Sequence, residues 1–396
     1  MANDIKIYKS RWIVPVSKHP LKDSYIIVSE DKIHSVVTEL QEEYKDYEVV
    51  DLGNSVVFPA FVNTHIHLEH SSPVFVPTNF KEYLFKCYEE EREPDDIRKN
   101  TINENIKDVL GYGTIAVADF SSDGISVNPL IESELFARVF IEIKGFRRLQ
   151  KDFILKRYKD IIDFLPVSKK VTCHFTPSSL ALTNEELLRA IFYREKHIAM
   201  HFGFEECERQ LLLNCNGLLK QYLLSVEDYD FDWKCPGKSP VNYMMENMLY
   251  TKHNLLVHCC DLTEEEIERL KELPEKINIS IAPRVYDSLS IKPPDIHKLI
   301  ENGFNICLGT ESRVVNNDLD LRNEMIRCVT KFKVSYDNAL KFATLNGAYA
   351  IGFHREVGSL EPGKVAKCLV IKNIDEEIDD PYKPIFNPDY KIEWLL

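Results

Sequence analysis

The sequence predicts an α/β protein whose main part is a (β/α)8 barrel of the TIM type. Eight short apolar runs follow one another along the chain, and amphipathic segments with helical spacing separate most of them. Alternation of strands and helices favours a parallel sheet covered by helices. An open doubly wound sheet shares this alternation, but it usually carries a glycine-rich phosphate loop, and neither GxGxxG nor GxxxxGK occurs here. The barrel is therefore the preferred prediction.

The predicted barrel strands are, in order, the runs VVFPAFVNTHIHLE, TIAVADFS, ARVFIEIKGF, KVTCHFTP, HIAMHFGFE, NLLVHCC, INISIAP and FNICLGTES. Segments such as TEEEIERLKEL and PDIHKLIENG have the apolar spacing of helices between them. In barrels of parallel strands, the active site lies at the C-terminal ends of the strands. Functional residues are therefore expected where these runs end.

The two ends of the chain do not follow the barrel pattern. Strand-like pieces at the N-terminus read IKIYKSRWIV, SYIIVSEDKI and YEVVDLG, and a turn and strand, GSLEPGKVAKCLVIK, follow the last predicted helix. Because strand units flank the barrel on both sides, we expect them to meet in one small β-sandwich. The predicted limits are 1–56 and 353–396 for its two parts and 57–352 for the barrel.

Composition excludes several classes of function. The chain has 396 residues and a formal net charge of −14, so its surface repels the phosphates of nucleic acids. No apolar run approaches the ~18 residues of a membrane span, and the N-terminus lacks the apolar core of a signal peptide. Ten cysteines without regular spacing indicate reduced thiols rather than a disulfide framework. We expect a cytoplasmic protein with a small-molecule substrate and neither a nucleic-acid nor a membrane partner, and we leave a homodimer open.

Histidines gather at the predicted strand ends. Those that end strands one, four, five and six are His65, His67, His174, His201 and His258. His65 and His67 are two residues apart, and such a pair points to the same side of an extended strand. Neutral imidazole is a common ligand of zinc and iron. A lone HxH pair is weak support for a metal, but its recurrence beside single histidines on three more strands favours a metal centre.

Two segments resemble a known family. FPAFVNTHIHLEHS is similar to the metal-binding signature of the amidohydrolase superfamily, and ATLNGAYAIGFHREVGSLEPGKVAKCLVI is similar to its closing motif. The resemblance covers nearly the whole chain. It implies a distorted (β/α)8 barrel, a two-part β-sandwich and one divalent metal ion, Zn²⁺ or else Fe²⁺. The implied metal ligands are His65, His67, His201 and the carboxylate after strand eight, Glu311.

Within the superfamily, the chain resembles the deaminase and chlorohydrolase branch, which acts on aminated purines and related rings. It is most similar to the aminodeoxyfutalosine deaminases of menaquinone biosynthesis. This resemblance implies substrate contacts for Glu69, Glu142, His174 and Arg284. A structural role stays open for each, since His174 can be a hydrogen-bonded barrel histidine and Arg284 an exposed loop residue. The two glutamates can equally support the HxH segment as hydrogen-bond acceptors.

The chain departs from the family pattern at positions that bear on catalysis. The aspartate that usually follows strand eight in LGTD is replaced by Glu311 in LGTES. Its extra methylene moves the carboxylate, and a misplacement of ~1 Å can cost ~100-fold in rate. The proton-shuttling glutamate of the usual HxxE motif is replaced by Phe204, so Glu205 becomes the candidate for that role. The tryptophan of the usual substrate loop is also not evident in FKEYLFKCYEEE.

Together these residues predict a metal-dependent aminohydrolase. The resemblance implies that it deaminates an aminated purine nucleoside, with aminodeoxyfutalosine as the substrate or, failing that, an adenosine-type nucleoside. His258 and Glu311 are expected to orient the attacking water and accept its proton. Glu205 is expected to protonate the ring nitrogen and the departing ammonia. Two alternatives stay open. Glu311 and Phe204 favour a catalytically impaired barrel that only binds, and the same fold also suits hydrolysis of another C–N or C–Cl bond.

Overall fold

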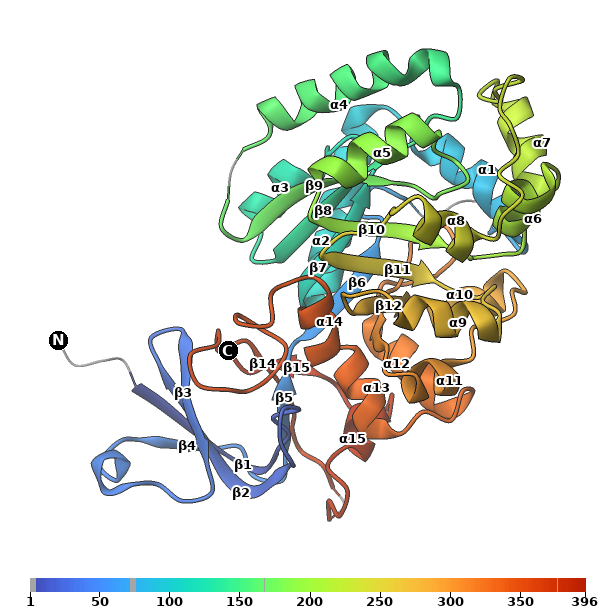
Figure 1. Ribbon diagram of the computed structural model, residues 1–396. Coiled ribbons are helices and arrows are strands. Elements are labelled where there is room, and N and C mark those ends of the chain that lie inside the picture. The colour runs from blue at the N-terminus through green and yellow to red at the C-terminus, as the bar shows by residue number, and fades with distance from the viewer. Residues whose placement is uncertain (1–4, 72–75, 167, 376) are drawn as a thin grey trace. The chain divides into compact units, whose positions relative to one another are not determined.

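The computed structural model describes residues 5–71, 76–166, 168–375 and 377–396 (Figure 1). The chain forms two compact units. The first comprises the chain up to Asn63, Val109–Ala116 and Asp320–Leu396, and the second comprises Thr64–Asp108 and Val117–Leu319. Among the described residues, no helix is both long enough and apolar enough to cross a membrane.

The first unit is built on a seven-stranded sheet that contains strands from both ends of the chain. The strands run in the order β15-β14-β5-β1-β2-β3, and β4 pairs with β1. Their bounds are β1 Ile5–Ile13, β2 Leu21–Ser29, β3 Lys32–Val37, β4 Val49–Asp51, β5 Val56–Pro59, β14 Cys368–Ile371 and β15 Glu393–Trp394. β14 runs antiparallel to β5, with Leu369 opposite Phe58. The two ends therefore share one sheet, whereas the expected sandwich of two layers is not confirmed among the described strands.

Period-two alternation divides the buried residues of this unit between the two faces of its sheet, and Ile7, Ile27 and Tyr44 form a cluster on one of them. Ile26 and Val28 of β2 point to the same side and pack with Ile13, Val57 and Val370. The helical segments of the unit are η1 Glu42–Tyr44, α12 Leu321–Thr330, α13 Tyr336–Phe342, α14 Leu345–Ala350 and α15 Lys383–Phe386.

Eight further strands correspond to the eight predicted barrel strands. Their bounds are β6 Phe61–Ile66, β7 Thr114–Ser121, β8 Phe136–Ile143, β9 Val171–Pro177, β10 His197–Phe202, β11 His253–His258, β12 Ile277–Ile281 and β13 Asn305–Leu308. They form two four-stranded sheets, β6-β7-β8-β9 and β10-β11-β12-β13. Backbone hydrogen bonds connect these sheets on both sides: His201 N donates to Ser178 O at 3.0 Å, and Glu311 N donates to His65 O at 3.0 Å. The strands thus follow one another around the barrel, although the regular ladder is interrupted twice.

Helices follow these strands, as the alternation predicts (Figure 1). Their bounds are α1 Phe80–Glu90, α2 Asp95–Gly111, α3 Val127–Glu132, η2 Arg148–Gln150, α4 Lys151–Phe164, α5 Glu185–Arg194, α6 Cys207–Asn214, α7 Leu218–Ser225, α8 Pro240–Glu246, α9 Glu264–Lys271, α10 Pro283–Ser288 and α11 Ile296–Glu301. α9 shows which local features of the sequence predict a helix. Thr263 and Glu266 form a capping box at its start, and Ile267 and Leu270 are buried on one face.

One pair of cysteines contradicts the expectation of reduced thiols throughout. Cys215, which follows α6, forms a disulfide with Cys235, and their Cα atoms are 5.5 Å apart. This Cα separation is usual for disulfides. The bond closes a loop of the chain that contains α7. Nothing in the spacing of the two residues, which are 20 apart, predicts their pairing.

Candidate metal centre

Four side chains converge within the second unit, at the C-terminal ends of three barrel strands. His65 lies in β6 and His67 follows it, His201 lies in β10, and Glu311 follows β13. One potential ligand atom from each of the four lies within 4.8 Å of the others. His67 Nε2 is 3.3 Å from His65 Nε2 and 3.4 Å from Glu311 Oε1. This spacing suits a single divalent cation held by nitrogen and oxygen donors.

The chemistry of the donors also fits such an ion. Burial lowers the pKa of His67 to about 3 and that of His65 well below its usual value, so both imidazoles are neutral and offer a lone pair. The Nε2 atom of His201 is buried, and it has no hydrogen-bond partner among the described residues. Three imidazoles and one carboxylate form a donor set that zinc and iron(II) both accept.

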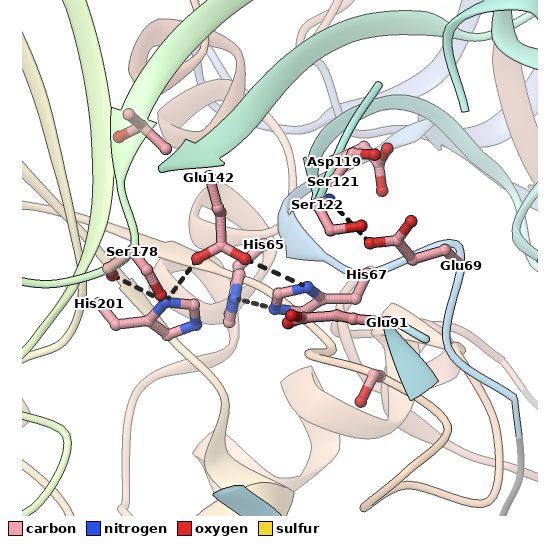
Figure 2. A network of polar contacts seen from close by, with 12 residues as sticks. His65, His67, Glu69, Glu91, Asp119, Ser121, Ser122, Glu142, Ser178 and His201 are labelled. Carbon is pink, nitrogen blue, oxygen red and sulfur yellow. Dashed lines mark hydrogen bonds and ion pairs between the residues drawn. The ribbon is translucent and has the colours of Figure 1, made fainter. Parts of the chain in front are cut away.

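Glu142 of β8 orients two of these imidazoles (Figure 2). Its carboxylate lies 3.4 Å from His201 Nδ1 and 4.0 Å from His67 Nδ1. Burial alone would raise the pKa of Glu142, but its contact with His201 and the charge of Lys144 outweigh burial and hold that pKa well below its usual range. His201 Nδ1 also lies 3.2 Å from the Ser178 carbonyl oxygen, its hydrogen-bond acceptor, so its Nε2 is left for a metal. Glu142 therefore supports the ligands, which is one of the two roles left open for it.

Glu311 is held in place by strong local contacts. Its φ of 61° is left-handed, a conformation that costs a non-glycine residue ~1–3 kcal/mol and is common at functional sites. Its carbonyl oxygen accepts from His67 N at 3.2 Å. Its carboxylate accepts hydrogen bonds from the Tyr83 hydroxyl and the Ser312 hydroxyl, both at 2.6 Å. These contacts fix the longer side chain with one oxygen beside His67.

His258 ends β11 next to the cluster, and Phe204 covers its ring. The centroids of these two rings are 3.5 Å apart and the ring planes differ by 9°. The His258 ring is 5.3 Å from that of His65 and 5.8 Å from that of His201. Burial lowers the pKa of His258, so its ring is neutral. Phe204, at the position of the usual HxxE glutamate, therefore packs against the residue expected to accept a proton.

A small cavity of about 70 Å³ adjoins the cluster. His67, Glu142 and His201 form part of its wall, and α1 and α7 contribute mainly apolar and aromatic side chains. The segment after β10 contributes Phe204, Glu205, Cys207 and Glu208. Small-molecule sites commonly combine apolar walls with a few polar groups in this way.

Glu205 and Glu69 differ in their relation to this cavity. Glu205 lines it, and its Oε2 accepts a hydrogen bond from Cys207 N at 2.8 Å. Glu69 is buried, with Oε1 accepting from Ser122 N at 2.8 Å and Oε2 from Arg98 Nη1 at 3.0 Å (Figure 2). Glu69 therefore ties the segment after β6 to its neighbours.

The structure does not bring His174 or Arg284 to the cluster. His174 lies in the middle of β9, where its ring contacts Glu195 at 3.1 Å and Arg138 at 3.2 Å. Arg284 forms an ion pair with Asp318 at 2.9 Å. Neither residue lines the cavity. The motif match gave their places along the chain, but the strand register directs His174 to neighbours outside the cavity.

Sequence reasoning missed Tyr83, which hydrogen-bonds Glu311 from a distant helix. A signal was present in α1. Phe80, Tyr83, Leu84 and Cys87 recur at helical spacing and all line the cavity, so they share one face of the helix. Ser312, the other donor to Glu311, carries no comparable signal.

Comparison with known proteins identifies the relationship. Residues 230–391 match the family model described as the Amidohydrolase family. This segment, less than half of the chain, is similar to the amidohydrolases. The resemblance seen in the HxH segment and the closing motif is thereby confirmed.

Proteins named as deaminases are similar to the chain over most of its length. The 5-methylthioadenosine/S-adenosylhomocysteine deaminase of Teredinibacter turnerae is 24% identical, covering 94% of this chain and 85% of its own length. Helicobacter pylori aminofutalosine deaminase in complex with methylthio-coformycin has a TM-score of 0.83 at 21% identity, covering 96% of this chain and 95% of that one. An adenosine deaminase from Xanthomonas campestris with bound zinc has a TM-score of 0.78 at 17% identity, covering 96% and 88%. The structural likeness confirms the barrel-type α/β fold.

Proposed function

We propose that this protein is a metal-dependent aminohydrolase that removes the exocyclic amine of a purine nucleoside. The observation that carries the proposal is the convergence of three imidazoles and the Glu311 carboxylate on one point beside a cavity. Relatives that are named as deaminases of adenosine derivatives support the reaction class. The donor set supports one divalent ion, for which Zn²⁺ is the first candidate and Fe²⁺ the second.

The residues around the ion have separate tasks. When bound by His65, His67, His201 and Glu311, the metal would acidify water and so supply the nucleophile for hydrolysis. Glu142 holds His67 and His201 with their Nε2 atoms toward that point. His258 is neutral and buried beside the cluster, so it can accept a proton from the attacking water.

The cavity supports a planar heterocycle as substrate. Phe80, Tyr83 and Tyr222 place aromatic rings along its wall, where they can stack on a planar ring. Within this class we propose aminodeoxyfutalosine, an intermediate of menaquinone biosynthesis, acted on in the cytoplasm. The resemblance of the HxH segment and the likeness to the Helicobacter pylori enzyme support this finer assignment.

A second candidate function is binding without turnover. It is favoured by Phe204, which occupies the HxxE glutamate position and stacks on His258. This protein would keep the fold and the metal while lacking the usual proton shuttle.

Ammonia release separates the two candidates. The purified protein, loaded with zinc or iron(II), is assayed on aminodeoxyfutalosine, 5-methylthioadenosine, S-adenosylhomocysteine, 5'-deoxyadenosine and adenosine, with metal-stripped protein as control. We expect ammonia from at least one nucleoside, and its loss on metal removal. Full metal occupancy without ammonia from any of them would contradict the deaminase proposal and support binding alone.

A further inference from the structure

We propose that Cys215 and Cys235 form a thiol–disulfide exchange site whose oxidation closes the substrate cavity. The bond between them closes residues 215–235 into a loop, the disulfide loop, which contains α7. Because the proposal concerns regulation of the candidate site, its effect on substrate rests on the proposed deaminase function. The exchange itself takes place between these two thiols and a small-molecule disulfide, and it needs no substrate.

The two cysteines differ from the other eight in their exposure. Cys235 is exposed and Cys215 is half-buried. Of the eight free cysteines, six are buried, and the remaining two, Cys173 and Cys260, are half-buried. Thiol–disulfide exchange proceeds by attack of a thiolate on a sulfur, so its rate depends on access to that sulfur. Cys235 is therefore the sulfur that a dissolved thiol or disulfide reaches most readily.

The disulfide loop contributes to the walls of two adjoining cavities. Leu219 and Tyr222 of α7 line the cavity of about 70 Å³ beside the metal ligands. Tyr222, Leu223 and Val226 line a second cavity of about 490 Å³. The ring of Tyr222, which belongs to both walls, packs edge-on against Phe85 of α1 with centroids 5.5 Å apart. The position of α7 therefore determines how far the two cavities are separated.

The disulfide-bonded structure leaves little room beside the metal ligands. Pockets that bind small molecules usually measure ~300–1,000 Å³, so a cavity of about 70 Å³ is too small for a nucleoside, whereas the second cavity is within that range. The residues common to both walls are Glu91, Glu142, Lys144, Leu182 and Tyr222. Of these, Tyr222 alone lies in the disulfide loop. Movement of α7 away from α1 would join the two cavities into one site with room for the substrate.

The disulfide restrains α7 at one of its ends. α7 has only eight residues, and isolated helices of that length are not stable in water, so it depends on its attachments. After the helix, the Asp228 carboxylate accepts hydrogen bonds from Phe146 N at 2.8 Å and from Arg147 N at 3.3 Å. Just before the helix, the bond of Cys215 to Cys235 ties the start of the loop to its end. The oxidised loop is therefore restrained on both sides of α7, and reduction releases one of them.

The proposed cytoplasmic location favours a reversible bond over a permanent one. Cytosolic thiols are kept reduced, and the disulfides that do form there are usually transient, catalytic or redox-sensing. The reduced protein, in which α7 can move, is then the working form. Oxidation gives the disulfide-bonded form with its small cavity.

The exchange is balanced with a small-molecule disulfide as the oxidant. The thiolate of Cys235 attacks one sulfur of that disulfide, whose S–S bond breaks to release one thiolate and leave a mixed disulfide at Cys235. The thiolate of Cys215 then attacks the Cys235 sulfur and displaces the second small thiolate. The two released thiolates take up the two protons that the cysteines lost. The protein gives up two electrons, and the small disulfide becomes two thiols.

Glutathione buffers test the exchange site directly. Protein kept in reduced glutathione should show ten free thiols after denaturation, and protein kept in oxidised glutathione should show eight, with Cys215 linked to Cys235 in peptide maps. Trypsin should cleave the reduced form faster after Lys220 and Lys234, which lie inside the loop, because the reduced loop is less restrained. Cleavage elsewhere in the chain is the internal reference.

Kinetics test the effect on the cavity. If oxidation leaves the open form in about one tenth of the molecules, KM for the nucleoside should rise about tenfold at constant metal content. The variant with both Cys215→Ser and Cys235→Ser should keep the low KM of the reduced protein in both buffers. Cys173→Ser removes a half-buried thiol outside the loop, and this variant should respond to oxidised glutathione as the wild type does.

The outcomes separate this proposal from the deaminase function. Ten free thiols in oxidised glutathione, or equal cleavage of the loop in both buffers, overturns the exchange site. An active protein that forms the bond but keeps its KM overturns the closure of the cavity and leaves the deaminase proposal intact. A metal-loaded protein that is silent on every nucleoside in both buffers overturns the deaminase function, and the thiol count and the cleavage rates then decide the exchange site on their own.

Discussion

The second unit contains two clusters of histidines at opposite ends of its barrel strands. The groups that the imidazole rings face differ between the two clusters. At the C-terminal ends of β6 and β10, His65, His67 and His201 turn ring nitrogens toward one another and toward Glu311. The second cluster consists of His174, His197 and His253. At the N-terminal ends of β10 and β11, His197 and His253 stack face to face with centroids 4.3 Å apart, and the ring of His174, in β9, is 5.0 Å from that of His197. The residue type is the same in both places, so the residue type alone does not make a metal centre.

The partners of the rings account for the difference. Ser178 O accepts from His201 Nδ1, and the Glu142 carboxylate lies on the Nδ1 side of both His67 and His201, so their Nε2 atoms are left for an ion. In the second cluster, His174 contacts Glu195 on one nitrogen and the Arg138 guanidinium on the other. A fixed cation and stacked rings disfavour an ion there. A metal centre therefore needs converging nitrogens and a carboxylate that orients them.

The largest expected difference is in metal content, when one histidine is removed from each cluster in separate variants. We expect His67→Ala to abolish stoichiometric metal binding, because it removes one of four ligands and the nitrogen nearest Glu311. His253→Ala should keep a full equivalent of metal. Metal analysis of the purified variants by mass spectrometry checks both. Equal metal content in the two would remove the distinction between the clusters.

A smaller loss should follow from removing the orienting carboxylate. Glu142→Ala should weaken metal affinity by about 10- to 100-fold, as is typical for partners of metal-bound histidines. Glu195→Ala, which removes the carboxylate of the other cluster, is the matched control and should not change the affinity. Competition with a zinc chelator gives both values. An unchanged affinity in Glu142→Ala would show that the histidines are oriented by other contacts.

Tyr83 should matter less than Glu142, because it acts on a ligand through one hydrogen bond. Its hydroxyl donates to Glu311 at 2.6 Å, and a hydrogen bond typically contributes a net ~0.5–1.5 kcal/mol. Tyr83→Phe should therefore reduce metal affinity by about tenfold. Tyr243→Phe changes another buried tyrosine, away from the cluster, and serves as the control in the same chelator titration. Equal affinities in both variants would contradict the role given to Tyr83.

The smallest expected effect concerns acid stability of the second cluster. Burial, together with Arg138, lowers the pKa of His197 from 6.5 to about 3. The unfolded chain therefore takes up a proton at this residue between pH 6.5 and about 3 while the folded chain does not, so stability falls as pH falls through this range. His197→Phe should flatten that fall and leave metal content unchanged. Urea unfolding at several pH values measures it, and an identical pH dependence in both proteins would contradict the shift.

The fold was predictable where its signals are local. The alternation of apolar runs and amphipathic segments gave the eight barrel strands, and TEEEIERLKEL gave α9 with its capping box. Long-range pairings were not predictable in the same way. The meeting of the two chain ends was expected, but not the register of β14 on β5, and Cys215 bonds Cys235 because tertiary packing brings together segments with no local sign of contact.

The residues of the candidate site show the same difference between local signals and long-range contacts. His65 and His67 point to one side because side chains alternate along a strand, and the HxH spacing in the sequence predicts this. His174 matched a motif equally well, yet the register of β8 and β9 sets it opposite Phe140 and sets Thr176 opposite Glu142. Tyr83 comes from a helix that only the folded chain brings to Glu311. Residue types and spacing predict candidates, while register and helix placement decide which of them meet.

The most direct test of the metal centre is a crystal of the zinc-loaded protein measured at the zinc absorption edge. The account predicts one anomalous peak about 2.0–2.2 Å from ligand atoms of His65, His67, His201 and Glu311. It predicts no peak at the rings of His174, His197 and His253. A zinc-loaded crystal with its peak at the second cluster, or with none within ligand distance of the first, would contradict the account.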